Sequence, residues 1–153
     1  DSCAAGTTGS TFSQFVFPLM VNGQTGGPLH QVNVPVNQTL QFAMAQPSFN
    51  PNPANFVILG ITVAPDAADA YVLPGNVGTL CFPTLYTNPT FPGLFTLANS
   101  FAPDPFALLP ATPAPWTSPY FTLAFPFQFA IQGVIEETPG VIRTTNAVLV
   151  NVY

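Results

Sequence analysis

The chain has 153 residues, of which 48% are hydrophobic and only 5% are charged, and its formal net charge at pH 7 is −5. This length fits one domain that can bury its own core, and fifteen phenylalanines argue against a disordered chain. Arg143 is the only basic side chain apart from one histidine, which excludes nucleic-acid binding because neutralising phosphates requires a basic patch.

Nineteen prolines and the lack of a 3.6-residue apolar period argue against helices. Alternating residues and short apolar runs predict an all-β fold, namely an antiparallel Ig-like or jelly-roll-type β-sandwich with an extended N-terminal strand. The expected strands lie near residues 12–21, 32–36, 39–45, 55–63, 70–73, 79–82, 94–99, 120–136 and 141–153. Pro126 is expected to divide or bulge the strand that contains it. We expect residues 1–30 to form an N-terminal extension and residues 31–153 to form the sandwich domain.

The first expected strand is apolar on both faces. It can be a central strand of its own sandwich or a strand donated to a neighbouring subunit. We predict the second arrangement, a strand donated to a neighbouring subunit. The predicted intersubunit residues are Phe12, Phe15, Val16, Phe17, Leu19, Met20 and Val21.

The last two expected strands form the clearest element. The segment Thr138-Pro139-Gly140-Val141 fits a type II turn, with Pro and Gly at its two central positions. Pairing Thr138 with Val141 places Ile131 opposite Val148 and Glu136 opposite Arg143. This register predicts a structural ion pair between Glu136 and Arg143.

No residue pattern indicates a catalytic or metal site. His30 is the only histidine, and no nucleophile motif accompanies it. Glu136 and Glu137 are neighbours on a strand and point to opposite faces, which does not suit a glycosidase. Asp66 and Asp69 either join a weak calcium site or lie in a solvated turn, and the second interpretation is the plainer one. We therefore expect no enzyme activity, no metal and no cofactor.

Cys3 and Cys81 are the only cysteines. An even number of cysteines in a secreted chain favours a disulfide, and two buried free thiols are the alternative. Asn37-Gln38-Thr39 matches the N-glycosylation sequon, so Asn37 is a candidate glycosylation site. Prolines interrupt the apolar segment 106–135, so we expect no membrane span.

Several short segments resemble a family of small secreted β-sandwich domains from environmental bacteria. These segments are Cys3-Ala4-Ala5-Gly6, Gly78-Thr79-Leu80-Cys81, Phe129-Ala130-Ile131-Gln132-Gly133 and Thr145-Asn146-Ala147-Val148. The resemblance implies a β-sandwich in which the two cysteines pair. More loosely, the low charge and the Thr- and Asn-rich surface resemble subunits of extracellular fibres that donate an N-terminal strand to the next subunit.

A typical soluble surface is about 25–35% charged, so this surface must be neutral and polar, coated with glycans or covered by other subunits. We therefore expect an extracellular or cell-surface structural subunit that forms a homopolymeric filament through strand addition and apolar contacts. The alternative is a secreted module that binds a carbohydrate or an apolar ligand. Its contacts would be exposed aromatic side chains such as Tyr86, Trp116 and Tyr120.

Overall fold

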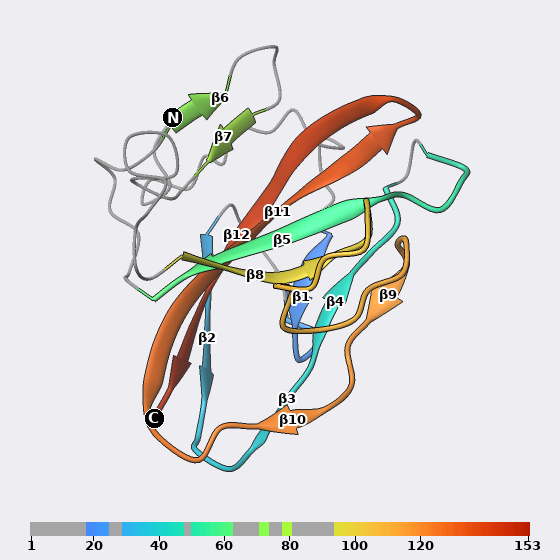
Figure 1. Ribbon diagram of the computed structural model, residues 1–153. Helices are drawn as coiled ribbons and strands as arrows, with labels where there is room; N and C mark the ends of the chain where they lie inside the picture. Colours follow the sequence, from blue (N-terminus) through green and yellow to red (C-terminus); the bar gives the residue numbers. More distant parts are fainter. Residues whose placement is uncertain (1–17, 25–28, 48–49, 63–70, 74–77, 81–93) are drawn as a thin grey trace.

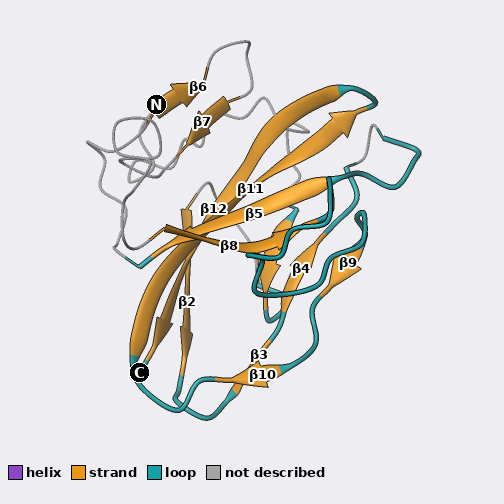
Figure 2. Cartoon of the chain, viewed as in Figure 1, coloured by secondary structure: helices purple, strands orange, loops and turns teal. Residues whose placement is uncertain are grey.

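The computed structural model describes residues 18–24, 29–47, 50–62, 71–73, 78–80 and 94–153. Every regular element among these residues is a strand, as Figure 2 shows. The prediction of an all-β chain is therefore confirmed for the described residues, whose sheets are antiparallel or mixed. Within the same residues, no helix is long and apolar enough to cross a membrane.

The strands lie close to their predicted places, with one addition, and the predicted strand 39–45 is divided into two strands that belong to different sheets. They are β1 (Leu19–Val21), β2 (Leu29–Val34), β3 (Thr39–Leu40), β4 (Phe42–Met44), β5 (Phe56–Ile61), β6 (Tyr71–Leu73), β7 (Gly78–Leu80), β8 (Leu94–Asn99), β9 (Trp116–Thr117), β10 (Phe121–Thr122), β11 (Phe127–Thr138) and β12 (Val141–Val152). The short strand β9 was not predicted. Pro126 separates β10 from β11, as expected.

The main sheet has the strand order β2-β12-β11-β5-β8. In it β2 runs parallel to β12, and the other neighbours are antiparallel. A smaller sheet has the order β1-β4-β9, while β3 pairs with β10 and β6 with β7. Figure 1 shows β1, β4 and β9 beside the main sheet, with β3 and β10 at the lower end of the molecule.

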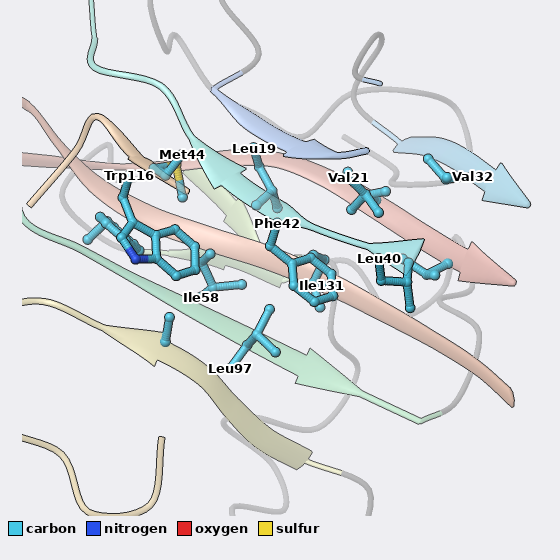
Figure 3. Packing of buried hydrophobic residues seen from close by; sticks show 14 of the residues in the cluster. Leu19, Val21, Val32, Leu40, Phe42, Met44, Ile58, Leu97, Trp116 and Ile131 are labelled. Atoms are coloured by element: carbon cyan, nitrogen blue, oxygen red, sulfur yellow. The ribbon is translucent and has the colours of Figure 1, made fainter. Parts of the chain in front are cut away.

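One hydrophobic core joins the main sheet to the smaller one. The ring of Phe56 on β5 lies 5.3 Å from the ring of Trp116 on β9, measured between centroids. The rings of Phe42 on β4 and Phe129 on β11 lie 6.2 Å apart. Figure 3 shows residues of the smaller sheet gathered with Ile58, Leu97 and Ile131 of the main sheet. Each such side chain contributes about 1.5–3 kcal/mol when it is fully buried.

The hairpin of β11 and β12 confirms much of the predicted register. Thr138 pairs with Val141 beside the turn, and Ile131 pairs with Val148 further along the two strands. Gly140 has a φ of 77°, which is the left-handed conformation that the third residue of a type II turn requires. The proline–glycine turn and the alternating pattern therefore locate this hairpin correctly.

Between these two points, two bulges shift the register by one residue. Glu136 lies opposite Ile142, and Arg143 lies opposite Ile135. The prediction that Glu136 and Arg143 face each other is therefore wrong. The reason is that one bulge adds a residue to β12 and the other adds one to β11, so that the shift cancels before the turn.

The bulge in β12 lies opposite a glycine in β11. Thr145 and Asn146 of β12 together stand opposite the single residue Gly133. The Gly133 amide donates a 2.9 Å hydrogen bond to the Thr145 hydroxyl. A Cβ atom at Gly133 would lie 2.8 Å from the terminal methyl carbon of Met44, so a side chain there would force Met44 to move. Glycine at this position thus favours the close approach of the two sheets.

The second residue of this bulge, Asn146, holds β1 in place. Its Nδ2 donates to the Leu19 carbonyl at 2.9 Å, and its Oδ1 accepts from the Leu19 amide at 3.1 Å. A neighbouring β-strand would form the same two hydrogen bonds, one with the amide and one with the carbonyl of Leu19. Asn146 and Leu19 are both buried, so these bonds are shielded from water. One side chain of the main sheet therefore takes the place of a strand partner for β1.

This arrangement corrects the predicted intersubunit strand at its C-terminal end. Leu19, Met20 and Val21 form β1 and pair with β4 of the same chain. The side chains of Leu19 and Val21 fill the core of their own subunit. The other predicted intersubunit residues, Phe12, Phe15, Val16 and Phe17, lie outside the described residues. The predicted division between residues 30 and 31 falls inside β2.

We predict that Asn146→Ala lowers the free energy of unfolding by about 2–4 kcal/mol, because two buried backbone groups each lose a hydrogen bond. Asn151→Ala is the matched control, since Asn151 lies on the same strand and makes an exposed side-chain bond to Asn33. Urea unfolding followed by the fluorescence of Trp116, the single tryptophan, measures both variants. Equal losses for the two variants would contradict the role assigned to Asn146.

Candidate functional site

The described residues contain a pocket of about 280 Å³ whose lining side chains are all hydrophobic. Its walls come from β4, β8, β10 and β11, and from the segments that follow β8 and β10. We call it the phenylalanine pocket. Its lining residues are Phe42, Phe95, Leu97, Leu108, Leu109, Phe121, Leu123, Phe127 and Phe129.

The spacing of the lining residues explains how strands build this pocket. Phe127 and Phe129 are two residues apart on β11, so both point to the same face of the main sheet. Phe121 and Leu123 show the same spacing on the other side of Pro126. Each strand that passes the pocket therefore contributes alternate side chains to its wall.

A glycine makes room for one wall of the pocket. Phe95 on β8 lies opposite Gly60 on β5, and a Cβ atom at Gly60 would overlap the Phe95 ring. The outer end of the ring therefore occupies the space that a side chain at position 60 would fill. The ring of Phe129 lies 6.1 Å from that of Phe95, edge to face, on the adjoining wall.

A chain of ring contacts leads from the core to the surface. The ring of Phe42 lies 5.4 Å from that of Phe121. On the other side, Phe127 lies 5.6 Å from Phe129 and 6.0 Å from Phe125. Phe129 is buried, whereas Phe125 is 57% exposed. The pocket is thus the inner part of an aromatic cluster that reaches the solvent.

Apolar side chains also form the rim of the pocket. Leu108, which lines it, is 65% exposed, and Phe125, whose ring contacts that of the lining residue Phe127, is also largely exposed. An exposed apolar patch of this kind is typical of a surface that binds a partner or a ligand. Because every lining side chain is a hydrocarbon, the pocket suits an apolar group that needs no hydrogen bonds.

The structure corrects one of the aromatic contacts proposed for a binding module. Trp116 is only 7% exposed, and its indole N–H donates to the carbonyl of Pro110 at 3.2 Å. Its ring packs on Phe56, so it supports the core. Tyr120 is exposed, as a contact residue would have to be, and Tyr86 lies outside the described residues.

Three described titratable residues either pair within a strand or accept hydrogen bonds from backbone amides. His30 lies in strand β2 opposite Val148, two residues before the predicted start of that strand. The Glu136 carboxylate accepts a 3.3 Å hydrogen bond from the Asn55 amide. The Asp104 carboxylate accepts a 2.9 Å bond from the Phe106 amide. No cluster of three metal-ligating residues occurs in the described segments.

The other predicted site residues fall into two groups. Asn37 lies in the exposed turn between β2 and β3, where its φ is 64° and its amide donates to the Leu123 carbonyl. The sequon is therefore on an accessible turn. Cys3, Cys81, Asp66 and Asp69 lie outside the described residues, so the predictions about them stay predictions.

The phenylalanine pocket itself was missed in the sequence. The available signal is a hydrophobic residue at every second position from Phe121 to Phe129. The same alternation is also typical of a strand that faces its own core. The partners that leave space beside these residues, such as Leu97 and Leu108, come from distant parts of the sequence.

No protein-family model matches the chain, and no curated protein is similar to it. The phenylalanine pocket and its rim are therefore the features from which a function is inferred.

We predict that toluene stabilises the folded protein, because it is apolar and small enough for the pocket. At tenfold excess over its Kd, a ligand that binds only the folded state adds about 1.4 kcal/mol to the free energy of unfolding. Leu123→Trp fills the pocket and abolishes this gain, whereas Ile142→Trp, on the exposed end of the β11–β12 hairpin, preserves it. Urea unfolding with and without toluene measures the effect. An equal gain in Leu123→Trp would show that toluene binds elsewhere.

Proposed function

We propose that the protein is a non-catalytic structural subunit that associates with copies of itself in an extracellular filament or surface assembly. The observation that carries the proposal is the apolar rim of the phenylalanine pocket, where Leu108 and Phe125 are exposed together with an open apolar cavity. Water-exposed apolar surface of this kind is stabilised when a second apolar surface covers it.

The charge of the chain supports the same proposal. Seven charged side chains, six acidic and one basic, are present in 153 residues. Repulsion between charged surfaces is one of the main effects that keep soluble proteins apart. A subunit whose surface is covered by other subunits does not need that repulsion. We propose an extracellular or cell-surface location for the assembly, with Cys3 and Cys81 paired and Asn37 available for glycosylation.

The arrangement of the strands supports a sandwich of the Ig-like or jelly-roll type. The two larger sheets share one core, in which Phe56 contacts Trp116 and Phe42 contacts Phe129. Among the described residues, β2 is the outermost strand on its side of the main sheet. An edge strand can accept a strand from another chain, so β2 is a second surface for assembly.

A binding module for an apolar ligand is the second candidate function. The pocket favours it, because a preformed cavity of this size with hydrocarbon walls is typical of sites for apolar molecules. The same walls argue against a carbohydrate, since sugars are held by hydrogen bonds as well as by aromatic stacking. A ligand-binding module remains a single particle at high concentration, whereas a structural subunit assembles.

We predict that self-association depends little on ionic strength, because apolar contacts rather than charge pairs hold the subunits together. Sedimentation velocity at 0.05 and 0.5 M NaCl should give the same distribution of assembled species. Ammonium sulfate should increase the assembled fraction, since sulfate strengthens apolar burial. Dissociation of the assembly by 0.5 M NaCl would contradict apolar association, and a monomer at every concentration would contradict the proposed function.

A further inference from the structure

We propose that the phenylalanine pocket of one copy accepts Phe15 and Phe17 of a second copy, so that copies join head to tail. The inference rests on the proposed self-association and names the two surfaces that meet. One is the described pocket, and the other is the segment of the chain that precedes β1.

The direction of β1 is the first argument. β1 is antiparallel to β4, with Leu19 opposite Met44 and Val21 opposite Phe42. Just before β1, the Pro18 carbonyl accepts a 2.8 Å hydrogen bond from the Ala45 amide. The chain therefore enters β1 beyond Met44, while the pocket lies at the other end of β4, beside Phe42. The N-terminal end of β1 therefore lies at the end of β4 opposite to the one that borders the pocket, a placement that favours the pocket of a second copy as the binding site for the preceding residues.

The alternation of side chains is the second argument. Leu19 and Val21 point into the core and are fully buried, while Met20 between them is partly exposed. In an extended segment the same face continues at every second residue, which selects Phe17 and Phe15. Two such positions are about 6.6 Å apart along a strand. The segment Thr11–Phe17 carries no charged residue, so hydrocarbon walls do not oppose its entry.

The size of the pocket is the third argument. A dry apolar cavity of about 150 Å³ holds one benzene ring. The phenylalanine pocket, at about 280 Å³, is close to twice that size, which matches two phenyl rings. The exposed side chain of Phe125, next to the lining residue Phe127, extends the apolar contact beyond the pocket. Because the segment and the pocket are different surfaces, their contact is heterologous and builds a filament unless the rotation between copies closes a ring.

Two complementary variants of the full chain test the inference. The segment variant combines Phe15→Ser with Phe17→Ser and keeps a working pocket. The pocket variant, Leu108→Arg, places a charge at the pocket mouth and keeps a working segment. Leu108 is largely exposed, so the substitution spares the core, and Phe125→Arg is a second pocket variant. Ile142→Arg is the matched control, because Ile142 is also exposed but lies on the β11–β12 hairpin.

Sedimentation velocity measures how far each variant assembles. We expect assemblies from the original chain and from Ile142→Arg, and a self-association constant about a hundredfold or more lower for each variant alone. An equal mixture of the segment and pocket variants should form dimers and nothing longer, because only one segment and one pocket are active in each pair. Unfolding followed by Trp116 fluorescence checks that every variant is folded.

The other outcomes separate the inference from the function on which it rests. Variants that assemble like the original chain overturn the inference and leave self-association intact. Monomeric variants that do not combine when mixed overturn it as well, since they indicate that the segment fills the pocket of its own subunit. An original chain that stays monomeric overturns both the inference and the proposed function.

Discussion

Two hydrogen bonds from the buried side chain of Asn146 to the backbone of Leu19 connect the main sheet to β1, the edge strand of the smaller sheet. Asn146 belongs to the bulge in β12 that stands opposite Gly133, where a side chain would crowd Met44 of the smaller sheet. With β1 held in this way, Leu19 and Val21 complete the core. The same attachment fixes the place and direction of β1, so the assembly that we propose depends on it.

The parts of the fold that could be predicted are those governed by local patterns. Alternation along β11 and β12, with a proline–glycine turn between them, located the hairpin and the pairing of Ile131 with Val148. The bulges could not be predicted, because an added residue leaves the apolar alternation on either side of it intact. The pairing of Glu136 with Arg143 was therefore wrong, although the pairs outside the two bulges, Ile131 with Val148 and Thr138 with Val141, were predicted correctly.

Tertiary contacts explain the remaining differences between prediction and structure. Trp116 lies in a proline-rich segment that has no periodic pattern, so nothing local indicated that its ring packs on Phe56. The segment Thr145-Asn146-Ala147-Val148 stood out as part of a family resemblance, without a physical role. The structure supplies that role, since Thr145 binds Gly133 and Asn146 binds Leu19.

The phenylalanine pocket and the scarcity of charge both support the contact between copies that we propose. A chain with a single arginine and no lysine has little surface charge to repel its copies. In the assembly that we propose, the open pocket with hydrocarbon walls is the specific contact site between copies, in contrast to a scattered apolar surface, which leads to disordered aggregation. The aromatic cluster then packs in the core at Phe129 and contributes to the proposed contact at Phe125.

Electron cryo-microscopy of the concentrated protein tests this account most directly. The account predicts filaments in which density for Phe15 and Phe17 of one subunit lies between Phe42 and Phe127 of the next. Monodisperse single particles would contradict the assembly. Filaments in which the pocket is empty, or is filled by the subunit's own N-terminal segment, would contradict the head-to-tail contact.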